Sequence, residues 1–401
     1  MKLSRAAPAD AARVTRAEVN LAHVRHNLHE LQAVLRDQAG DGTPPKIWAV
    51  LKADGYGHGA RAMGMTLERA GVDGICVALL EEGIELRNAG VRCPILVMGG
   101  YYGRFRDGIE ALIAHDLTPV VYDADQVRAL AGTLSYLDET KRLAVHVKID
   151  TGMGRLGVFN GDLRQLLDAL RQAGQLELEG LMTHLACADA ESLDVTREQL
   201  ERFEETERIV RAAGFRPSLR HAANSAALLR WPGSHLEVVR PGIAVYGVHP
   251  CIGRSSFALR IPKLKPVMRV SSEVIALRTL PAGAGVGYGH RWIAPRTSRI
   301  ATIPMGYADG LPRALSGKGD VLICGKRAPI VGDVSMDLTT VDVTDHPGVS
   351  VRDEVVVVGE QKGRLGSETI TIEEMASNTD TIPYEVLTSI SRRVPRFYRQ
   401  A

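Results

Sequence analysis

The feature that most restricts the fold of this chain is a regular alternation of short apolar runs with amphipathic segments between residues 47 and 246. Short apolar runs are typical of buried strands, and apolar residues spaced three or four apart are typical of helices. The eight predicted strands are Ile47–Ala53, Gly74–Leu79, Pro94–Gly99, Thr118–Tyr122, Leu143–Asp150, Leu178–His184, Ser218–Ala222 and Glu237–Tyr246. The predicted helices between them include Glu81–Ala89, Ala124–Leu137, Leu163–Ala173 and Arg197–Ala213. This count predicts a (β/α)8 TIM-like barrel, because the alternative, a doubly wound sheet, usually has fewer strands.

The pattern changes after about Lys263. β-branched runs separated by Gly, Pro and Asp turns replace the helices, which indicates a mostly β domain. The predicted strands there are Val267–Ile275, Ser298–Ile303, Asp320–Ile323, Thr339–Val343 and Glu354–Val358, and one helix is predicted at Ile372–Thr379. We therefore predict three parts: a tail and strand at 1–20 that pack with the C-terminal domain, a barrel at 21–262, and the β domain at 263–401.

Composition excludes several classes of protein. The 401 residues carry a formal net charge of +2, so there is no basic surplus for nucleic acid. The sequence contains no run of about 18 apolar residues, so no membrane span is predicted. The polar stretch Met1–Arg16 does not resemble a signal peptide. We therefore expect a cytoplasmic protein with at most a short disordered tail. The cysteines, which show no disulfide or zinc spacing, are Cys76, Cys93, Cys187, Cys251 and Cys324.

Three histidines also fail to predict a metal site. His23, His26 and His29 occur along a segment, Glu18–Leu35, that reads as a strand tip followed by a helix. They point in different directions around that helix, and no carboxylate lies at a suitable offset. We expect surface histidines and no bound metal.

Polar side chains occur at the ends of several predicted strands, where a barrel carries its catalytic groups. The clearest is Lys52, which ends a run that is apolar on both faces and precedes a turn with three glycines. Burial lowers the pKa of an ammonium group, and a neutral amine can form a Schiff base with a carbonyl. The other strand-end residues are Lys148, Asp150, His184, Asn224, Ser225 and Arg240.

A dinucleotide-binding motif competes with this interpretation. Residues 152–157 read GMGRLG, which matches G-x-G-x-x-G after a predicted strand. However, the helical pattern starts only near Asp162, and the unit is the fifth repeat and not the first. A Rossmann-type dehydrogenase is therefore the weaker alternative.

Nine short stretches carry a resemblance to a known family. They are AVLKADGYGHG (49–59), VKIDTGMGRLG (147–157), THLACAD (183–189), NSAA (224–227), RPGIAVYG (240–247), VGYGH (286–290), IPMGYADG (303–310), VGDVSMD (331–337) and PYEVLT (383–388). In this order, over a barrel and a β domain, they resemble the pyridoxal phosphate-dependent alanine racemases from about Thr15 to Tyr398.

The resemblance implies a role for each matching residue. Lys52 would bind the cofactor aldehyde as a Schiff base, and Arg240 would face the pyridine nitrogen, with His184 against it. The cofactor phosphate would be bound by hydroxyl groups and backbone amides. The cofactor-binding residues implied are Lys52, Tyr56, His184, Asn224, Ser225, Arg240, Gly242, Ile243 and Tyr384.

The resemblance also implies a two-base mechanism and a homodimer with shared active sites. Lys52 would serve the face of the D-enantiomer, and Tyr288 from the partner chain would serve the L face. The substrate carboxylate would be held by Arg155 and the amide of Met336. Tyr307, with Tyr384 and Met336, would keep the site small, and the supporting residues would be Lys148, which some relatives carry in carbamylated form, and Asp337.

The sequence departs from the family pattern at two places, and three alternative functions are considered. Many relatives have a cysteine where this chain has Ser335, and the polar N-terminal extension has no assigned role. The alternatives are a related decarboxylase, a non-catalytic pyridoxal phosphate-binding barrel, and a racemase for serine or basic amino acids. The first would not be expected to contain RPGIAVYG or VGYGH and the second would lack the β domain, but the third stays open.

Overall fold

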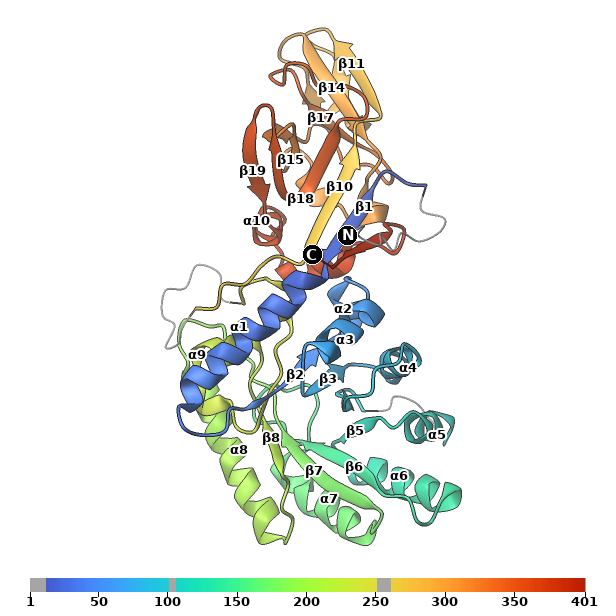
Figure 1. Cartoon of the computed structure of the whole chain (residues 1–401), viewed down its shortest axis with the longest axis vertical. Helices are drawn as coiled ribbons and strands as arrows, with labels where there is room; N and C mark the ends of the chain where they lie inside the picture. The colour runs from blue at the N-terminus through green and yellow to red at the C-terminus, as the bar shows by residue number, and fades with distance from the viewer. Residues whose placement is uncertain (1–11, 101–105, 251–260, 401) are drawn as a thin grey trace.

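Eight parallel strands with helices between them form one lobe of the molecule, drawn below the other lobe in Figure 1. The computed structural model describes residues 12–100, 106–250 and 261–400. Along the sheet the strand order is β8-β7-β6-β5-β4-β3-β2-β9, so neighbours in sequence are neighbours in space. The strands are β2 (Lys46–Val50), β3 (Gly74–Val77), β4 (Ile95–Val97), β5 (Thr118–Val121), β6 (Leu143–Lys148), β7 (Leu176–Met182), β8 (Leu219–His221) and β9 (Val238–Val239). The predicted (β/α)8 class is confirmed.

The two ends of this sheet meet and nearly close the barrel. The backbone amide of Glu237 donates to the carbonyl of Arg220 (3.2 Å), and that of Arg240 donates to the carbonyl of Ala223 (2.9 Å). The Arg220 guanidinium also forms an ion pair with the Glu237 carboxylate at 2.6 Å. Strands β8 and β9 are thereby held side by side, and the Arg240–Ala223 bond joins the segments that follow them at the C-terminal end of the barrel.

The helices agree closely with the sequence pattern. Helix α6 has the predicted bounds, and α4, α7 and α8 differ from prediction by at most three residues at either end. No helix in the described ranges is both long and apolar enough to span a membrane. The helices of this lobe are α1 (Leu21–Ala39), α3 (Ala60–Arg69), α4 (Leu80–Asn88), α5 (Arg106–Ala114), α6 (Ala124–Leu137), α7 (Asn160–Gln172), α8 (Asp194–Ala212) and α9 (Ser225–Arg230).

The second lobe is mostly β, as predicted. A seven-stranded sheet contains β16-β15-β18-β10-β1-β20 with β19 paired to β18, and a three-stranded sheet contains β11-β14-β17. Several strands were not predicted because they are short or largely exposed, so their sequences lack a clear alternation. The strands are β1 (Arg16–Asn20), β10 (Met268–Glu273), β11 (Ala276–Leu280), β12 (Gly285–Val286), β13 (Trp292–Ile293), β14 (Ser298–Ile303), β15 (Asp320–Ile323), β16 (Lys326–Pro329), β17 (Thr339–Asp342), β18 (Glu354–Gly363), β19 (Gly366–Ile370) and β20 (Arg396–Arg399), with helices α10 (Ile372–Asn378) and α11 (Pro383–Ser389).

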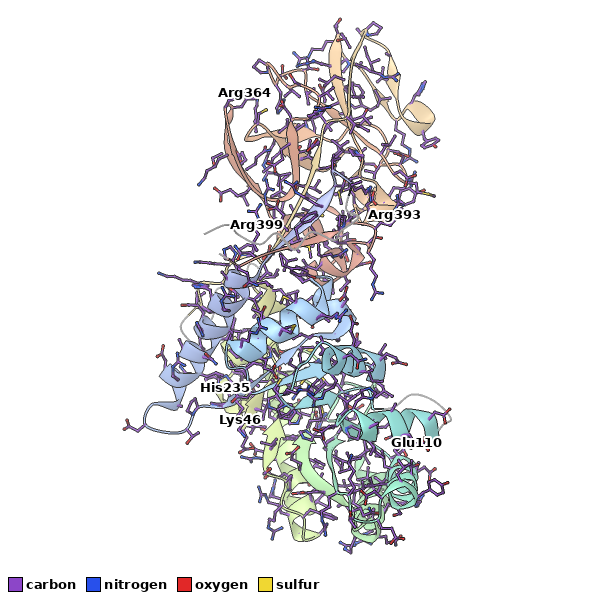
Figure 2. All side chains as sticks on the ribbon, turned by 45° about the vertical axis from the view of Figure 1, so that its right-hand side comes forward. Lys46, Glu110, His235, Arg364, Arg393 and Arg399 are labelled. Atoms are coloured by element: carbon purple, nitrogen blue, oxygen red, sulfur yellow. The ribbon has the colours of Figure 1, made fainter. Side chains whose placement is uncertain are left out.

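The junction between the lobes is built from residues far apart in sequence. Strand β1 pairs antiparallel with β10 and parallel with β20, and α1 then leads from β1 along the barrel (Figure 1). Figure 2 shows Arg393 and Arg399 at this junction, whereas Lys46 and His235 lie on the barrel. The domain boundaries at residues 20 and 262 stay predictions.

Asn27 fastens α1 to the segment that connects the lobes. Its fully buried side chain donates to the carbonyls of Val245 (3.1 Å) and Lys265 (2.9 Å) and accepts from the Lys265 amide (2.7 Å). One amide side chain thus satisfies three backbone groups. Buried backbone groups without partners are rare because each costs free energy.

We expect Asn27→Leu to lower the free energy of unfolding by about 2–3 kcal/mol, because three buried backbone groups lose their partner. Urea unfolding followed by circular dichroism measures the change. Gln38→Leu, on an exposed position of the same helix, is the matched control and should change stability little. Equal stability of the two variants would contradict this role of Asn27.

Candidate functional site

Lys52 lies on a left-handed turn that directly follows β2. The sequence predicts a strand through Ala53, but β2 ends at Val50, so the prediction is wrong for the last residues. In α2 (Lys52–Tyr56), the φ angles of Ala53, Asp54 and Tyr56 are 53°, 55° and 50°. Left-handed backbone costs about 1–2 kcal/mol for each residue other than glycine, so surrounding contacts must maintain it.

The contacts that maintain this turn come from both lobes. The Glu82 carboxylate accepts from the Ala53 amide at 2.6 Å. Asp54 Oδ1 accepts from the amide of Ala60 at 2.8 Å. From the junction, Arg396 Nε donates to the Gly57 carbonyl at 3.0 Å. Residues held in strained conformations are concentrated at functional sites, and here the strain fixes the position of Lys52.

A cavity of about 210 Å³ lies next to this turn, at the C-terminal ends of the barrel strands. Val50 and Met98 also line it and were not predicted, because apolar side chains near a site have no distinct sequence signal. The predicted site residues that line the cavity are Lys52, Tyr56, His184, Asn224, Ser225, Arg240, Gly242, Ile243 and Tyr384. All nine predicted cofactor-binding residues are therefore brought together in one place.

Hydrogen-bonding groups converge at one part of the cavity. Ser225 Oγ accepts from the Gly242 amide at 2.8 Å. The Tyr56 ring packs against Tyr384, with ring centroids 5.9 Å apart. A Cβ atom on Gly242 would lie only 2.5 Å from the Tyr56 hydroxyl oxygen, so this position must be glycine for the hydroxyl to fit. Hydroxyl and amide groups arranged in this way suit a phosphate.

The cavity and its surroundings carry four cationic side chains. Burial, and then Arg155, lower the pKa of the Lys52 amine. Burial, Arg155 and Arg240 lower the pKa of Lys148 to about 8. Like charges gathered in this way favour an anionic ligand, because an anion relieves their mutual repulsion.

Arg240 is buried and forms no ion pair with a carboxylate in the described ranges. Its Nη1 donates to His221 Nδ1 at 2.7 Å, and its Nη2 donates to the Thr183 carbonyl at 2.7 Å. Burial lowers the pKa of Arg240 to about 10, so it remains protonated at neutral pH. Burial and Arg240 lower the pKa of His184 to about 3, which keeps that ring neutral. The histidine hydrogen-bonded to Arg240 is thus His221, which was not predicted from the sequence.

The glycine-rich loop at 152–157 surrounds a carboxylate of the chain itself. Asp150 Oδ1 accepts from the amides of Gly152 (2.9 Å), Met153 (2.9 Å) and Gly154 (3.1 Å). Its Oδ2 accepts from the amide of Arg155 at 3.1 Å. These amides are already occupied, and α7 begins only at Asn160, so the loop does not form a dinucleotide-binding turn.

Apart from Tyr384, the predicted site residues of the β domain do not line the cavity. Tyr288, Met336 and Tyr307 are 74%, 53% and 44% exposed. Asp337 is also exposed and forms an ion pair with Arg393 at 2.7 Å. Ser335 Oγ donates to the Leu338 carbonyl at 2.6 Å, which holds a local turn.

These β-domain residues nevertheless gather on neighbouring loops. The amides of Tyr307 and Ala308 donate to the carbonyls of Ser335 and Met336, each at 3.0 Å. Gly287, next to Tyr288, lies against Gly332 and Asp333, because a Cβ atom there would meet the Asp333 amide at 3.5 Å. The loops around 288, 307 and 336 therefore form one exposed group of residues, separate from the Lys52 cavity.

No group of His, Cys, Asp and Glu side chains within the described ranges could hold a metal. His23 and His26 instead bond to the carbonyls of Pro266 (2.6 Å) and Lys263 (2.7 Å), so they help to attach α1. Four cysteines are free thiols, and Cys251 lies outside the described residues, as does most of the N-terminal extension.

Two family models match nearly the whole chain. The model described as "Alanine racemase, N-terminal domain" matches residues 19–250, and "Alanine racemase, C-terminal domain" matches residues 267–398. Among curated relatives, the chain is 58% identical to an alanine racemase of Sorangium cellulosum (strain So ce56), over 97% of this chain and 100% of that protein. It is 42% identical to an alanine racemase of Symbiobacterium thermophilum, over 97% and 98%.

Solved structures agree with these matches. The alanine racemase from Bacillus anthracis with bound L-Ala-P has a TM-score of 0.87 at 32% identity, covering 98% of this chain and 96% of that one. The alanine racemase from Bartonella henselae with covalently bound pyridoxal phosphate has a TM-score of 0.81 at 29% identity, covering 96% and 99%.

If the cavity binds pyridoxal phosphate, as the sequence resemblance implies, we expect Gly242→Ala to weaken that binding at least about tenfold, because the added methyl group would displace the Tyr56 hydroxyl from the cavity. Titration of the cofactor-free protein, followed by absorbance, measures the dissociation constant. Gly132→Ala, where a Cβ atom meets nothing within 4 Å, is the matched control. Unchanged affinity in Gly242→Ala would contradict the assignment of this part of the cavity.

Proposed function

This chain belongs to the alanine racemase family, and from that premise we propose that it interconverts L- and D-alanine with pyridoxal phosphate as cofactor and with Lys52 and Tyr288 as the two bases. The observation that carries the proposal is that nine residues scattered between positions 52 and 384 line one cavity around a lysine with a lowered pKa. Four other residues of the proposed site lie on exposed loops of the β domain: Tyr288, Tyr307, Met336 and Asp337.

The residues present fit pyridoxal phosphate. The Ser225 hydroxyl, the Gly242 amide and the Tyr56 and Tyr384 hydroxyls would hold the phosphate. Lys52 would attach the cofactor aldehyde, since its pKa is lowered and the amine is more readily neutral. When bound, the cofactor supplies a conjugated ring that withdraws electrons from the α-carbon of the substrate.

Arg240 would donate a hydrogen bond to the pyridine nitrogen. A guanidinium with a pKa of about 10 keeps its proton at neutral pH, so it does not protonate that nitrogen. A carboxylate at this position would favour a charged ring and a stronger electron sink. The arginine therefore suits a reaction in which a proton is removed and returned and no other bond to the α-carbon breaks.

The two proton transfers require bases on opposite faces of the α-carbon. From D-alanine, the Lys52 amine would accept the α-proton on one face, and the Tyr288 hydroxyl would give a proton to the other face. The product is L-alanine, with Lys52 protonated and Tyr288 deprotonated until both exchange protons with solvent. In the reverse direction the two residues exchange roles.

We propose that Tyr288 reaches the site from a second copy of the chain. Tyr288 does not line the cavity formed by its own chain, and three quarters of its surface is exposed. Tyr307 and Met336, also proposed to contact the substrate, are exposed beside it. A single chain thus carries two incomplete halves of a site, and a two-fold dimer can complete both. Arg155 and the amide of Met336 would then hold the substrate carboxylate.

D-alanine supply for peptidoglycan in the cytoplasm is the cellular role that we propose for this activity. Racemisation of serine is the second candidate, because Ser335 replaces a cysteine near the substrate region and side chains that differ by one small group are discriminated by only about 1–3 kcal/mol. Basic amino acids would need space that Tyr307, Tyr384 and Met336 are proposed to fill.

We expect alanine to be the best substrate, with slower but measurable turnover of serine. A circular-dichroism assay of the purified holoenzyme with each L-amino acid measures both. Ser335→Cys should change the serine-to-alanine ratio of kcat/KM modestly. Faster turnover of lysine or arginine than of alanine would overturn the proposed substrate.

Mixing two inactive variants tests the shared site. Lys52→Ala and Tyr288→Phe should each be nearly inactive as homodimers, and Lys52→Ala should retain no borohydride-reducible cofactor. In a mixed dimer one site carries both changes and the other carries neither. Refolding the two variants together should therefore restore about a quarter of wild-type activity per total protein, if half of the dimers are mixed.

The control for this experiment is subunit exchange itself, which mass spectrometry of differently labelled chains measures. If each chain built its own site, every site in the mixture would carry one change and no activity would return. No recovery despite confirmed exchange would therefore rule out the shared arrangement.

A further inference from the structure

Arg240 is the first member of a hydrogen-bonded chain that runs through the interior of the barrel. Arg240 Nη1 lies 2.7 Å from His221 Nδ1, and His221 Nε2 lies 2.8 Å from His146 Nδ1. His146 Nε2 lies 3.1 Å from Glu179 Oε2. Both histidines are completely buried, whereas the Glu179 side chain is 35% exposed. The chain thus links the proposed cofactor site with a carboxylate near the barrel surface.

The direction of each hydrogen bond in this series can be deduced from its Arg240 end. A guanidinium can only donate, so His221 Nδ1 must accept. The proton of a neutral His221 is then on Nε2 and donates to His146 Nδ1. His146 in turn carries its proton on Nε2 and donates it to Glu179. Burial, and then Arg240, lower the pKa of His221, and burial lowers that of His146, which agrees with two neutral rings.

The backbone is shaped to place Glu179 at the end of this chain. Val145 pairs with Leu178 and His146 with Gly180, so Glu179 is an extra residue in β7. Such bulges change the direction of a side chain and are frequent near active sites. A Cβ atom on Gly180 would lie 2.3 Å from the His146 ring, so this glycine leaves the space that the ring fills.

Packing also holds the two rings in place. The centroid of the His146 ring is 5.4 Å from that of Trp48 and 4.9 Å from that of His221. Barrel interiors are usually filled by branched aliphatic side chains. Here three ring side chains occupy part of the interior, and two of them form the hydrogen-bonded connection.

We infer that Glu179 is a positioning residue that fixes the protonated nitrogens of His146 and His221 and thereby the orientation of Arg240. This inference rests on the proposed function, in which Arg240 faces the cofactor. Without an acceptor at Glu179, His146 could place its proton on Nδ1. His221 would then place its own on Nδ1, directly against the N–H of Arg240, and the guanidinium would have to turn away.

The test compares Glu179→Leu with Glu179→Gln. Leucine removes the acceptor, whereas the glutamine carbonyl can still accept from His146 Nε2. Two-dimensional 1H–15N spectra of histidine-labelled protein report which ring nitrogen carries the proton, and the His221 signals are assigned by their loss in His221→Gln. We expect a fixed Nε2–H form in the wild type and in Glu179→Gln, and a shifted or mixed form in Glu179→Leu.

Racemisation gives the second readout. We expect kcat to fall by roughly 10-fold to 100-fold in Glu179→Leu, the range typical when the hydrogen-bond partner of a metal-binding histidine is removed, and to stay near the wild-type value in Glu179→Gln. Glu177→Leu is the matched control, because Glu177 is exposed on the same strand two residues earlier. It should change neither the spectra nor kcat.

If Glu179→Leu does not fold, His146→Phe decides the question, since phenylalanine keeps the ring packing but cannot accept from His221. Unchanged His221 signals in Glu179→Leu or His146→Phe would overturn the inference, as would an equal effect of Glu177→Leu. Failure of the wild type to bind pyridoxal phosphate would overturn the proposed function instead. The histidine 1H–15N spectra would still test the hydrogen bonds from Arg240 to Glu179.

Discussion

The left-handed turn after β2 is the constraint on which the site depends. Its backbone conformation is unfavourable for Ala53, Asp54 and Tyr56, so it persists only because other segments hold it. The Glu82 carboxylate accepts from the amides of Ala53, Ala78 and Leu79 and so joins the ends of β2 and β3. Gly57 makes close contact with α11, since a Cβ atom there would lie 2.4 Å from the Leu387 carbonyl oxygen. Both lobes therefore determine where the Lys52 amine lies.

The sequence predicts the barrel well because each strand is a separate apolar run whose signal does not depend on distant residues. It also predicts the cavity residues, since Lys52, Arg240 and Ser225 follow strand ends and belong to motifs of a known family. It does not predict the end of β2, because contacts from Glu82 and Arg396 override the local strand preference. Tyr288 does not line the Lys52 cavity within one chain, which agrees with the proposal that it reaches the site from a second copy.

The histidines of the barrel interior were missed for a different physical reason. His146 and His221 lie within strands, where a single polar residue looks like an interruption of the apolar pattern. Their hydrogen bonds depend on the register of β6, β7 and β8, including the extra residue in β7, and no local sequence pattern shows that register. Burial of these polar rings is tolerated because each ring nitrogen has a partner.

The position of β1 has a consequence for the order of folding during synthesis. Strand β1 is made first, but it lies between β10 and β20, and its partner residues in β20 are 396–399. The whole barrel is therefore translated between β1 and the strands with which it pairs. Contacts within the barrel are mostly between neighbouring units and can form as the chain emerges, whereas the sheet at the junction can close only after residues 396–399 have been translated. Because α11 also supports the turn of Lys52, the proposed catalytic centre is completed only after α11, more than 300 residues further along the chain by subtraction, has left the ribosome.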